Sequence, residues 1–246
     1  MIKDKVAIIT GASSGIGYAT ALALSKAGAK VAIGARRVDR LEELAKKISA
    51  DGGEVFYQKL DVTQRSECEN FAKAVLEKWG SIDILVNNAG LMPLSLFKSL
   101  KVDEWDRMID VNIKGVLYCT GSVILHMKEK KSGHIVNISS VAGRTVFPTG
   151  TVYCATKHAI TAFSEGLRQE FSARSNIRVT SIEPGVVATE LTDTITDESL
   201  QGFIENAKKM ETLQAGDIAN AILYAVESPS HVNVNEVLIR PTTQER

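Results

Sequence analysis

The sequence predicts a doubly wound α/β fold, in which helices cover both faces of one parallel sheet of about seven strands. Short, wholly apolar runs rich in β-branched residues recur along the chain, and segments of helical periodicity separate them. A parallel sheet covered on both faces requires strands of this kind. Because the 246 residues contain no linker, repeat or low-complexity stretch, we expect a single domain over residues 1–246.

The first half of the chain opens with an apolar strand over 6–10 and an Ala- and Leu-rich helix over 16–27. Gly28 is expected to end that helix as a C-cap glycine. A helix over 38–50 has apolar residues at helical spacing and ends before a Gly-Gly pair. The same alternation predicts strands over 31–35, 55–60 and 82–86, and a helix over 64–79.

The second half continues the alternation to the last predicted strand. It predicts helices over 102–130, 152–173 and about 217–227, and strands over 134–138, 177–182 and 237–240. The segment 189–212 departs from the pattern, since it is polar and only weakly periodic. A mobile substrate loop and an ordinary pair of surface helices both fit this segment.

The composition excludes several classes of protein. Lys plus Arg and Asp plus Glu both number 29, so the net charge of zero predicts no nucleic-acid or anionic-membrane surface. We find no apolar run near the roughly 20 residues of a membrane span and no signal-peptide region, and we expect a cytoplasmic protein. Three cysteines without CxxC spacing and four histidines without HExxH predict neither a disulfide framework nor a metal site.

A glycine-rich turn, Thr10-Gly-Ala-Ser-Ser-Gly-Ile-Gly17, joins the first strand to the first helix. Glycines at this junction let the backbone approach a pyrophosphate at the helix N-terminus. The turn also matches the GxSxG elbow of serine hydrolases, which would make Ser13 a nucleophile. An elbow on the first strand has no upstream loop to supply a second oxyanion donor, and the absence of Gly-Lys-Ser/Thr excludes a P-loop.

The end of the second strand reads Ala35-Arg36-Arg37, where NAD-binding folds place an acid for the ribose 2′-hydroxyl. Two guanidinium groups suit a 2′-phosphate instead. The alternative, a pair of solvated arginines, is disfavoured because cations are unfavourable at a helix N-terminus. This pattern predicts NADP(H) as the cofactor.

Tyr153 and Lys157 lie four residues apart, which places both side chains on one face of a predicted helix. A tyrosine with a pKa near 10 is a poor base at neutral pH. A lysine cation about 4 Å away is expected to stabilise the phenolate by ~4 kcal/mol at an effective dielectric of 20. The pair therefore predicts acid–base chemistry, although an exposed tyrosine beside a solvated lysine has the same spacing.

Taken together, these motifs make the chain resemble the short-chain dehydrogenase/reductase family, in its compact Rossmann-fold form, over residues 5–241. The motifs occur in order: the glycine turn, Asp61-Val62, Asn87-Asn88-Ala89-Gly90, Asn112, Ser139-Ser140, Tyr153-xxx-Lys157 and Pro184-Gly185.

The resemblance implies a role for each catalytic candidate. Tyr153 would be the general acid of carbonyl reduction and the base of alcohol oxidation, and Ser140 would bind the substrate oxygen. Lys157 would bind the nicotinamide ribose and depress the pKa of Tyr153, and Asn112 would hold a water in the proton relay. Cys154 is expected only to pack.

The resemblance also implies the cofactor contacts. A basic residue that some NADP-dependent members carry in the glycine turn is replaced here by Ser14, so phosphate recognition would rest on Arg36 and Arg37, with Ser13 as a contact. Thr189 would contact the carboxamide, and it also fits a helix N-cap. The full predicted set is Gly11, Ser13, Ser14, Gly15, Ile16, Gly17, Arg36, Arg37, Asp61, Val62, Asn88, Ala89, Gly90, Tyr153, Lys157, Pro184, Gly185, Val187 and Thr189.

The predicted substrate pocket is mostly apolar, which favours a neutral ketone, aldehyde or secondary alcohol. Its predicted lining residues are Leu91, Met92, Leu94, Val146, Phe147, Val187 and Leu191. Arg144 would bind a substrate carboxylate, or else be a structural arginine that bonds backbone carbonyls of its loop.

The sequence thus predicts an NADP(H)-dependent oxidoreductase acting on a small molecule. A non-catalytic NADP(H) sensor or scaffold on the same fold is the alternative, and an epimerase or dehydratase would need an additional substrate domain. Residues 113–127 are apolar almost all round, which predicts burial on every side. We therefore expect a homotetramer or homodimer.

Overall fold

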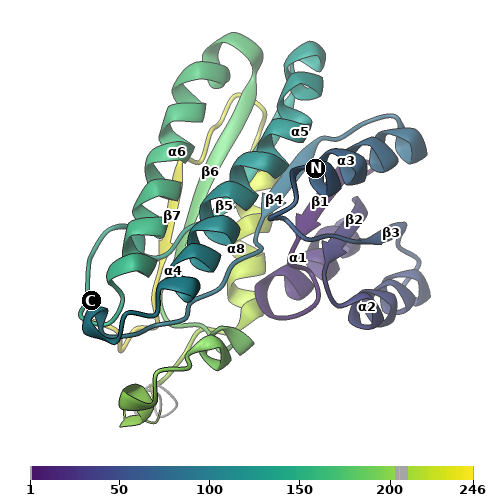
Figure 1. Cartoon of the computed structure of the whole chain (residues 1–246). Coiled ribbons are helices and arrows are strands. Elements are labelled where there is room, and N and C mark those ends of the chain that lie inside the picture. Colours follow the sequence, from purple (N-terminus) through teal and green to yellow (C-terminus); the bar gives the residue numbers. More distant parts are fainter. Residues whose placement is uncertain (1, 203–204, 206–209, 246) are drawn as a thin grey trace.

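The computed structural model describes residues 2–202, 205 and 210–245. Its sheet is built from β1 (Val6–Thr10), β2 (Lys30–Ala35), β3 (Val55–Lys59), β4 (Ile84–Asn87), β5 (Gly133–Ile138), β6 (Ile177–Pro184) and β7 (Glu236–Ile239). All neighbouring strands pair in parallel, in the order β3-β2-β1-β4-β5-β6-β7 (Figure 1). The predicted doubly wound fold is confirmed.

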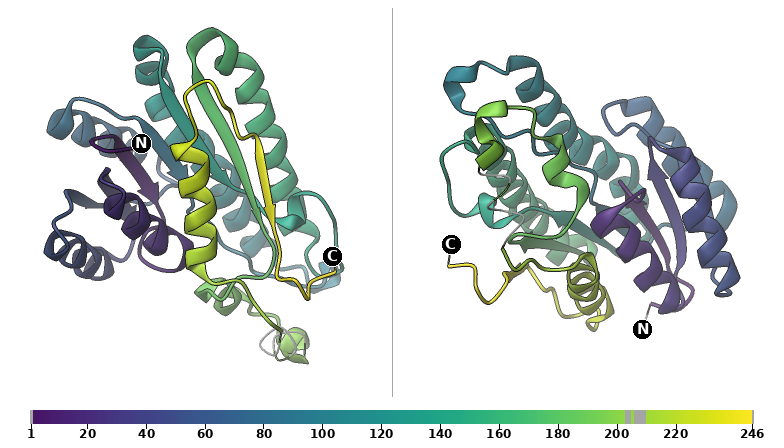
Figure 2. Two further views of the ribbon diagram at one scale, coloured as in Figure 1. Left: turned by 180° about the vertical axis from the view of Figure 1, so that it is seen from behind. Right: turned by 90° about the horizontal axis from the view of Figure 1, so that it is seen from below.

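Helices cover both faces of this sheet (Figures 1 and 2). One face packs against α1 (Gly15–Lys26), α2 (Val38–Ala50) and α8 (Ala215–Glu227), and the other against α3 (Arg65–Trp79), α5 (Gly115–Lys130) and α6 (Thr151–Ser175). Successive strand residues serve opposite faces, so Ile9 belongs to the first apolar core and Ile8 to the second. This explains why the central strands β1 and β4 are buried along their whole length.

The predicted helix over 102–130 is present but not regular. It consists of α4 (Val102–Ile109), a π-helical turn over Asp110–Lys114 and α5. By length and composition alone this stretch could cross a membrane, but core helices of globular proteins meet the same criterion. Here α5 packs Val123 and Met127 into the second core.

The chain reverses its direction of travel across the sheet at β1, which lies between β2 and β4. In open parallel sheets, ligands bind outside the carboxyl ends of the strands at such a switch point. The loops after β1, β4, β5 and β6 meet at this edge. The predicted substrate loop extends from the same edge as two short 3₁₀ helices, Glu190–Thr194 and Glu198–Leu200; residues 203, 204 and 206–209 of it lie outside the described residues.

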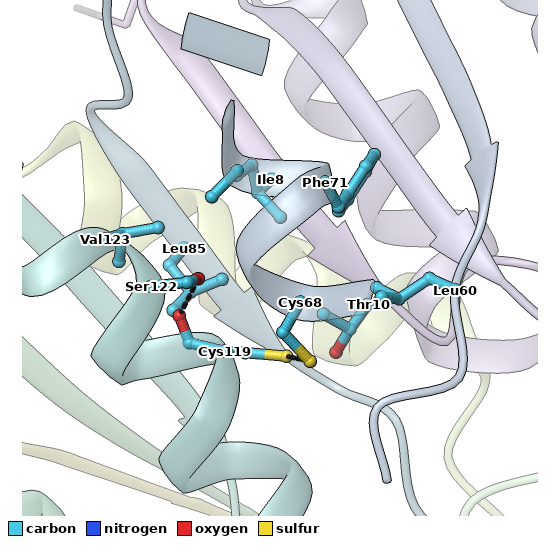
Figure 3. A pocket seen from close by; sticks show the side chains of 10 residues that line it. Ile8, Thr10, Leu60, Cys68, Phe71, Leu85, Cys119, Ser122 and Val123 are labelled. Atoms are coloured by element: carbon cyan, nitrogen blue, oxygen red, sulfur yellow. Dashed lines mark hydrogen bonds between the residues drawn. The ribbon is translucent and has the colours of Figure 1, made fainter. Parts of the chain in front are cut away.

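The three cysteines are free and buried. Cys68 of α3 and Cys119 of α5 face each other with their sulfur atoms 3.5 Å apart, in a small gap lined by core residues such as Ile8 and Leu85 (Figure 3). Cys154 is buried beside Tyr153 in a third apolar cluster. All three therefore serve as packing residues in the folded chain.

Candidate active site

The glycine turn lies directly against the segment that follows β4. A Cβ on Gly11, whose φ is +66°, would lie 2.8 Å from the Ala89 Cα atom, and one on Gly17 would lie 2.4 Å from the Asn88 side-chain nitrogen. The Thr10 hydroxyl accepts hydrogen bonds from the backbone N–H groups of Asn88 (3.0 Å) and Ala89 (3.1 Å). Only glycine fits such an approach, so these residues form one rigid floor.

The N-terminus of α1 opens onto this floor. Ser14 occupies the N-cap position, but its side chain makes no capping bond to the helix. Gly15 begins α1 with a φ of +55°, and Ile16 packs into the first core. Uncapped N–H groups and the helix dipole favour an anion here. The turn therefore fits a pyrophosphate, as the sequence predicts.

The two predicted phosphate-binding arginines differ in their surroundings. Arg37 donates to the Ser13 hydroxyl (3.0 and 3.2 Å) and to the Ser14 hydroxyl (2.7 Å), and pairs with Glu190 at 2.8 Å. Arg36 is exposed and forms no ion pair with any described residue. Ala35 ends β2, and the two residues that follow it are arginines rather than an acid. Arginines, with Glu190 paired to Arg37, thus occupy the place after β2 where NAD-binding folds put an acid.

The arrangement of Ser13 does not suit a nucleophile. Its hydroxyl accepts from a guanidinium, whereas a hydrolase serine donates to an imidazole. Nothing in the site supports the hydrolase alternative.

Asp61 and Val62 follow β3 and shape the turn there. The Asp61 carboxylate accepts from the Thr63 N–H (3.0 Å) and hydroxyl (2.8 Å). Val62 is buried against Gly115, where a Cβ would lie only 2.7 Å from the valine methyl. These two predicted cofactor contacts therefore lie at the same edge of the sheet as the glycine turn.

Tyr153 and Lys157 lie on one face of α6, as predicted, and both are buried. The Lys157 Nζ donates to the Ile138 carbonyl (2.8 Å) and lies 5.8 Å from the centre of the Tyr153 ring. Both side chains thus lie beside the end of β5. This arrangement does not match the alternative of a solvated tyrosine and lysine.

The two adjacent serines after β5 point to different partners. The Ser140 hydroxyl donates to the Pro184 carbonyl (3.3 Å) and accepts from the Ala142 N–H (3.1 Å). The Ser139 hydroxyl instead donates to the backbone carbonyl of Lys157 on α6 (3.0 Å). Ser140 is therefore the serine that faces the edge where β5 and β6 end.

Asn112 lies in the π turn and ties three elements together. Its Oδ1 accepts from the Leu91 N–H and its Nδ2 donates to the Leu91 carbonyl, both at 2.9 Å. The Nδ2 also donates to the Thr156 hydroxyl on α6 (3.2 Å). A Cβ on Gly90 would lie 3.4 Å from the Asn112 Oδ1 and 3.9 Å from the Lys157 Nζ. The four predicted catalytic residues are thus brought together.

The protonation of the pair differs from the sequence argument. Burial raises the pKa of Tyr153 to about 12, although hydrogen bonding to Ser140 acts in the opposite direction. Burial also lowers the pKa of Lys157 to about 8, because desolvation disfavours the ammonium. The expected depression of the tyrosine pKa by Lys157 is not seen in this structure, because desolvation of the buried phenol dominates. Tyr153 is therefore a neutral proton donor at neutral pH.

The segment after β6 passes over the glycine turn. The Gly185 N–H donates to the Ile239 carbonyl (2.7 Å), and Val187 forms a parallel bridge with Leu213. Thr189 caps the following 3₁₀ helix through the Leu191 N–H (3.4 Å), and its methyl lies 3.1 Å from where a Gly15 Cβ would be. The capping role predicted for Thr189 is present, and its position also adjoins the expected cofactor.

The expected substrate-facing residues divide into two groups. Leu91, Leu94, Met92 and Phe147 gather with Tyr153 in the third apolar cluster. The other three lie outside this cluster: Val146 is 76 % exposed, Val187 packs into the first core, and Leu191 is half-buried in the 3₁₀ helix Glu190–Thr194. The cluster also contains residues that periodicity alone did not single out, because tertiary packing brings them there: Met108, Ile195 and Leu200.

Arg144 has a structural role. Its guanidinium forms a bidentate pair with the buried Glu183 (2.8 and 3.1 Å) and contacts Glu236 on β7. Two protein carboxylates rather than backbone carbonyls hold it, so the expected partners are corrected. Because its guanidinium is paired with these two carboxylates, Arg144 does not fit a role in binding a substrate carboxylate.

Several known proteins are similar to this chain in sequence and in fold. A family model described as short chain dehydrogenase matches residues 5–200. An uncharacterized oxidoreductase of Staphylococcus saprophyticus is 50 % identical over 244 residues, covering 99 % of this chain and 98 % of that protein. The closed form of serine dehydrogenase complexed with NADP⁺ superposes with a TM-score of 0.90, at 35 % identity over 98 % of this chain and 96 % of that one. A Burkholderia phymatum short-chain dehydrogenase/reductase in complex with NAD has a TM-score of 0.87, at 26 % identity over 96 % of this chain and 89 % of that one.

Proposed function

Because the chain belongs to the short-chain dehydrogenase family, we propose that it is an NADP(H)-dependent oxidoreductase acting on a ketone, aldehyde or secondary alcohol. The observation that carries the proposal is the cluster of Ser140, Tyr153 and Lys157, which Asn112 ties to the floor of the expected cofactor site. A sensor or scaffold would need the glycine turn and the arginines but not this cluster. The cluster therefore favours an enzyme.

In this mechanism the nicotinamide supplies or accepts the hydride when it is bound. Tyr153, kept neutral by burial, donates its phenolic proton to the carbonyl oxygen. The Ser140 hydroxyl, whose single proton bonds the Pro184 carbonyl in this structure, would turn to donate to the same substrate oxygen. The Lys157 ammonium donates a hydrogen bond to the Ile138 carbonyl and has further N–H donors for ribose hydroxyls. The apolar cluster around Tyr153 excludes water and suits a neutral substrate.

The cofactor preference rests on the end of β2. Arg36 and Arg37 would hold the 2′-phosphate together with the hydroxyls of Ser13 and Ser14, which already bond Arg37. The complex of serine dehydrogenase with NADP⁺ supports this choice, while the NAD complex shows that the fold itself accepts either cofactor. The preference is thus a property of these side chains.

The proposed activity is tested by following cofactor oxidation with a panel of neutral ketones, aldehydes and oxo acids. We expect turnover with NADPH on neutral carbonyls, above that on oxo acids. The contrary result would be a wild type that binds NADPH but oxidises it no faster than the Tyr153→Phe variant with every carbonyl of the panel. That result would favour a non-catalytic sensor over an enzyme.

The pH dependence of reduction should reflect Lys157. Its pKa of about 8 lies below the ordinary lysine value, so the ammonium is lost as pH rises through 8, whereas Tyr153 stays protonated up to about 12. We expect kcat/KM for carbonyl reduction to be level below pH 8 and to fall above it. The arginine of a Lys157→Arg variant stays charged, so the residual kcat/KM of that variant should not fall above pH 8. A wild-type profile level to about pH 10 contradicts the assignment.

We also propose that the enzyme is a homotetramer or homodimer. On α5, Leu117 (41 % exposed), Gly121 and Leu125 (65 % exposed) form an uncovered stripe at spacing i, i+4, i+8. On α6, small exposed residues offer close packing: Ala155, Ala162 and Gly166. Light scattering should give two or four times the monomer mass, and Leu125→Glu should lower it. A wild-type monomer at micromolar concentration excludes this interface.

A further inference from the structure

Glu190 connects the start of the substrate loop to the cationic cluster after β2. Its carboxylate pairs with Arg37 at 2.8 Å and with Arg40 at 2.5 Å, across about 150 positions of sequence. The preceding residue, Thr189, packs its methyl over Gly15 of the glycine turn. A loop carboxylate thus lies directly beside the expected site of the cofactor phosphates.

The same guanidinium serves two sets of partners. Arg37 bonds Ser13 and Ser14 of the glycine turn through Nε and Nη2, and it bonds Glu190 through Nη1. Arg40, one helical turn further along α2, has Glu190 as its ion-pair partner among the described residues. Glu190 therefore acts as the counter-ion of both arginines.

We propose that Glu190 is a specificity-determining residue of the cofactor site, whose carboxylate, held by Arg40, competes with the 2′-phosphate of NADP(H) for Arg37. The inference rests on the proposed NADP(H) dependence. The 2′-hydroxyl of NAD(H) carries no charge and cannot displace a carboxylate from two guanidinium groups. Glu190 thus selectively weakens NADP(H) binding and limits the preference that the arginines create.

Charge balance gives the reason for competition. The two arginines and Glu190 carry a net charge of +1. A bound phosphate monoester brings between one and two negative charges at neutral pH. Phosphate and carboxylate on the same guanidinium groups would repel each other, so binding of the phosphate moves Glu190 away. The start of the substrate loop, which carries Glu190, moves with it.

The proposal is tested by measuring the Kd of NADP⁺ and NAD⁺ for the whole protein by calorimetry. Glu190→Gln keeps the shape and removes the charge, and it should lower the Kd for NADP⁺ about fivefold while changing that for NAD⁺ less than about twofold. The matched control is Glu69→Gln, because Glu69 is 51 % exposed and pairs with Arg65 at 2.7 Å on α3, whereas Glu190 is 43 % exposed. It should alter neither constant.

A second variant separates competition from a structural effect. In an Arg37→Gln background the contested guanidinium is gone, so Glu190→Gln should tighten NADP⁺ binding less than it does in the wild type. If Glu190→Gln weakens NADP⁺, the carboxylate positions Arg37 for the phosphate and competition is refuted. If both cofactors tighten equally, the effect is not specific to the phosphate and the proposal is likewise refuted.

The Kd values of NADP⁺ and NAD⁺ for the wild type test the proposed cofactor dependence separately from the role of Glu190. A wild type that binds NADP⁺ no more tightly than NAD⁺ contradicts the proposed cofactor dependence whatever Glu190 does. A wild type that prefers NADP⁺, combined with a Glu190→Gln variant of unchanged selectivity, refutes only the competition.

Discussion

Replacing Tyr153 with phenylalanine should lower kcat for carbonyl reduction by a factor of roughly 10²–10⁴ and leave the Kd for NADPH nearly unchanged. The ring packs in the apolar cluster with Leu94 and Met108, and phenylalanine retains that packing. The substitution removes only the hydroxyl. Burial raises the pKa of this hydroxyl, so it is protonated at neutral pH. Rate and binding should therefore separate.

The neighbouring residue supplies the control for this variant. Cys154 is equally buried in the same cluster but has no role in proton transfer, so Cys154→Ala should leave kcat almost unchanged. Thermal unfolding of both variants should verify that the fold is intact. A phenylalanine variant that keeps more than about a tenth of the wild-type rate removes Tyr153 from the mechanism.

The double variant Ala35→Asp/Arg36→Leu should reverse the cofactor preference. Loss of one guanidinium removes a charge-assisted contact to the 2′-phosphate, and the new carboxylate repels the phosphate but accepts a bond from a ribose hydroxyl. Such contacts are worth about 1.5–3 kcal/mol, so kcat/KM with NADPH should fall by roughly 10- to 100-fold. With NADH it should rise.

The variant Ala35→Asn/Arg36→Leu isolates the new charge. It has the same side-chain size at position 35 but no carboxylate, so it should lose efficiency with NADPH without a comparable gain with NADH. If the Asp-containing variant still favours NADPH as strongly as the wild type, recognition of the phosphate does not depend on the end of β2.

The fold was predictable because short, mostly apolar strands such as β1 and β4 alternate with helical segments along the chain. These signals are local, so the seven strands were placed within a few residues of their observed bounds, as with 82–86 against Ile84–Asn87. The parallel arrangement followed from the alternation, whereas the order of the strands came from the structure. The π turn at Asn112 was not predictable, since residues 102–130 keep a helical composition and the turn is fixed by bonds to the distant Leu91.

The residues of the candidate site were predictable from the sequence, but their ion pairs and pKa values were less so. Motif spacing identified Ser140, Tyr153 and Lys157, and the structure brings them together. The Glu190 pairs with Arg37 and Arg40 join segments far apart in sequence and left no local pattern. The tyrosine pKa depended on an assumed distance and on burial, and burial is known only after folding.

The most direct test of the central claim follows deuterium from NADPH labelled at the C4 position of the nicotinamide, with each face labelled in turn, into the product of a neutral ketone or aldehyde. Our account predicts one deuterium on the carbinol carbon of the alcohol, from one labelled face only, and no labelled product with Tyr153→Phe above about a hundredth of the wild-type rate. An alcohol formed without deuterium from either labelled cofactor would contradict the proposed hydride transfer.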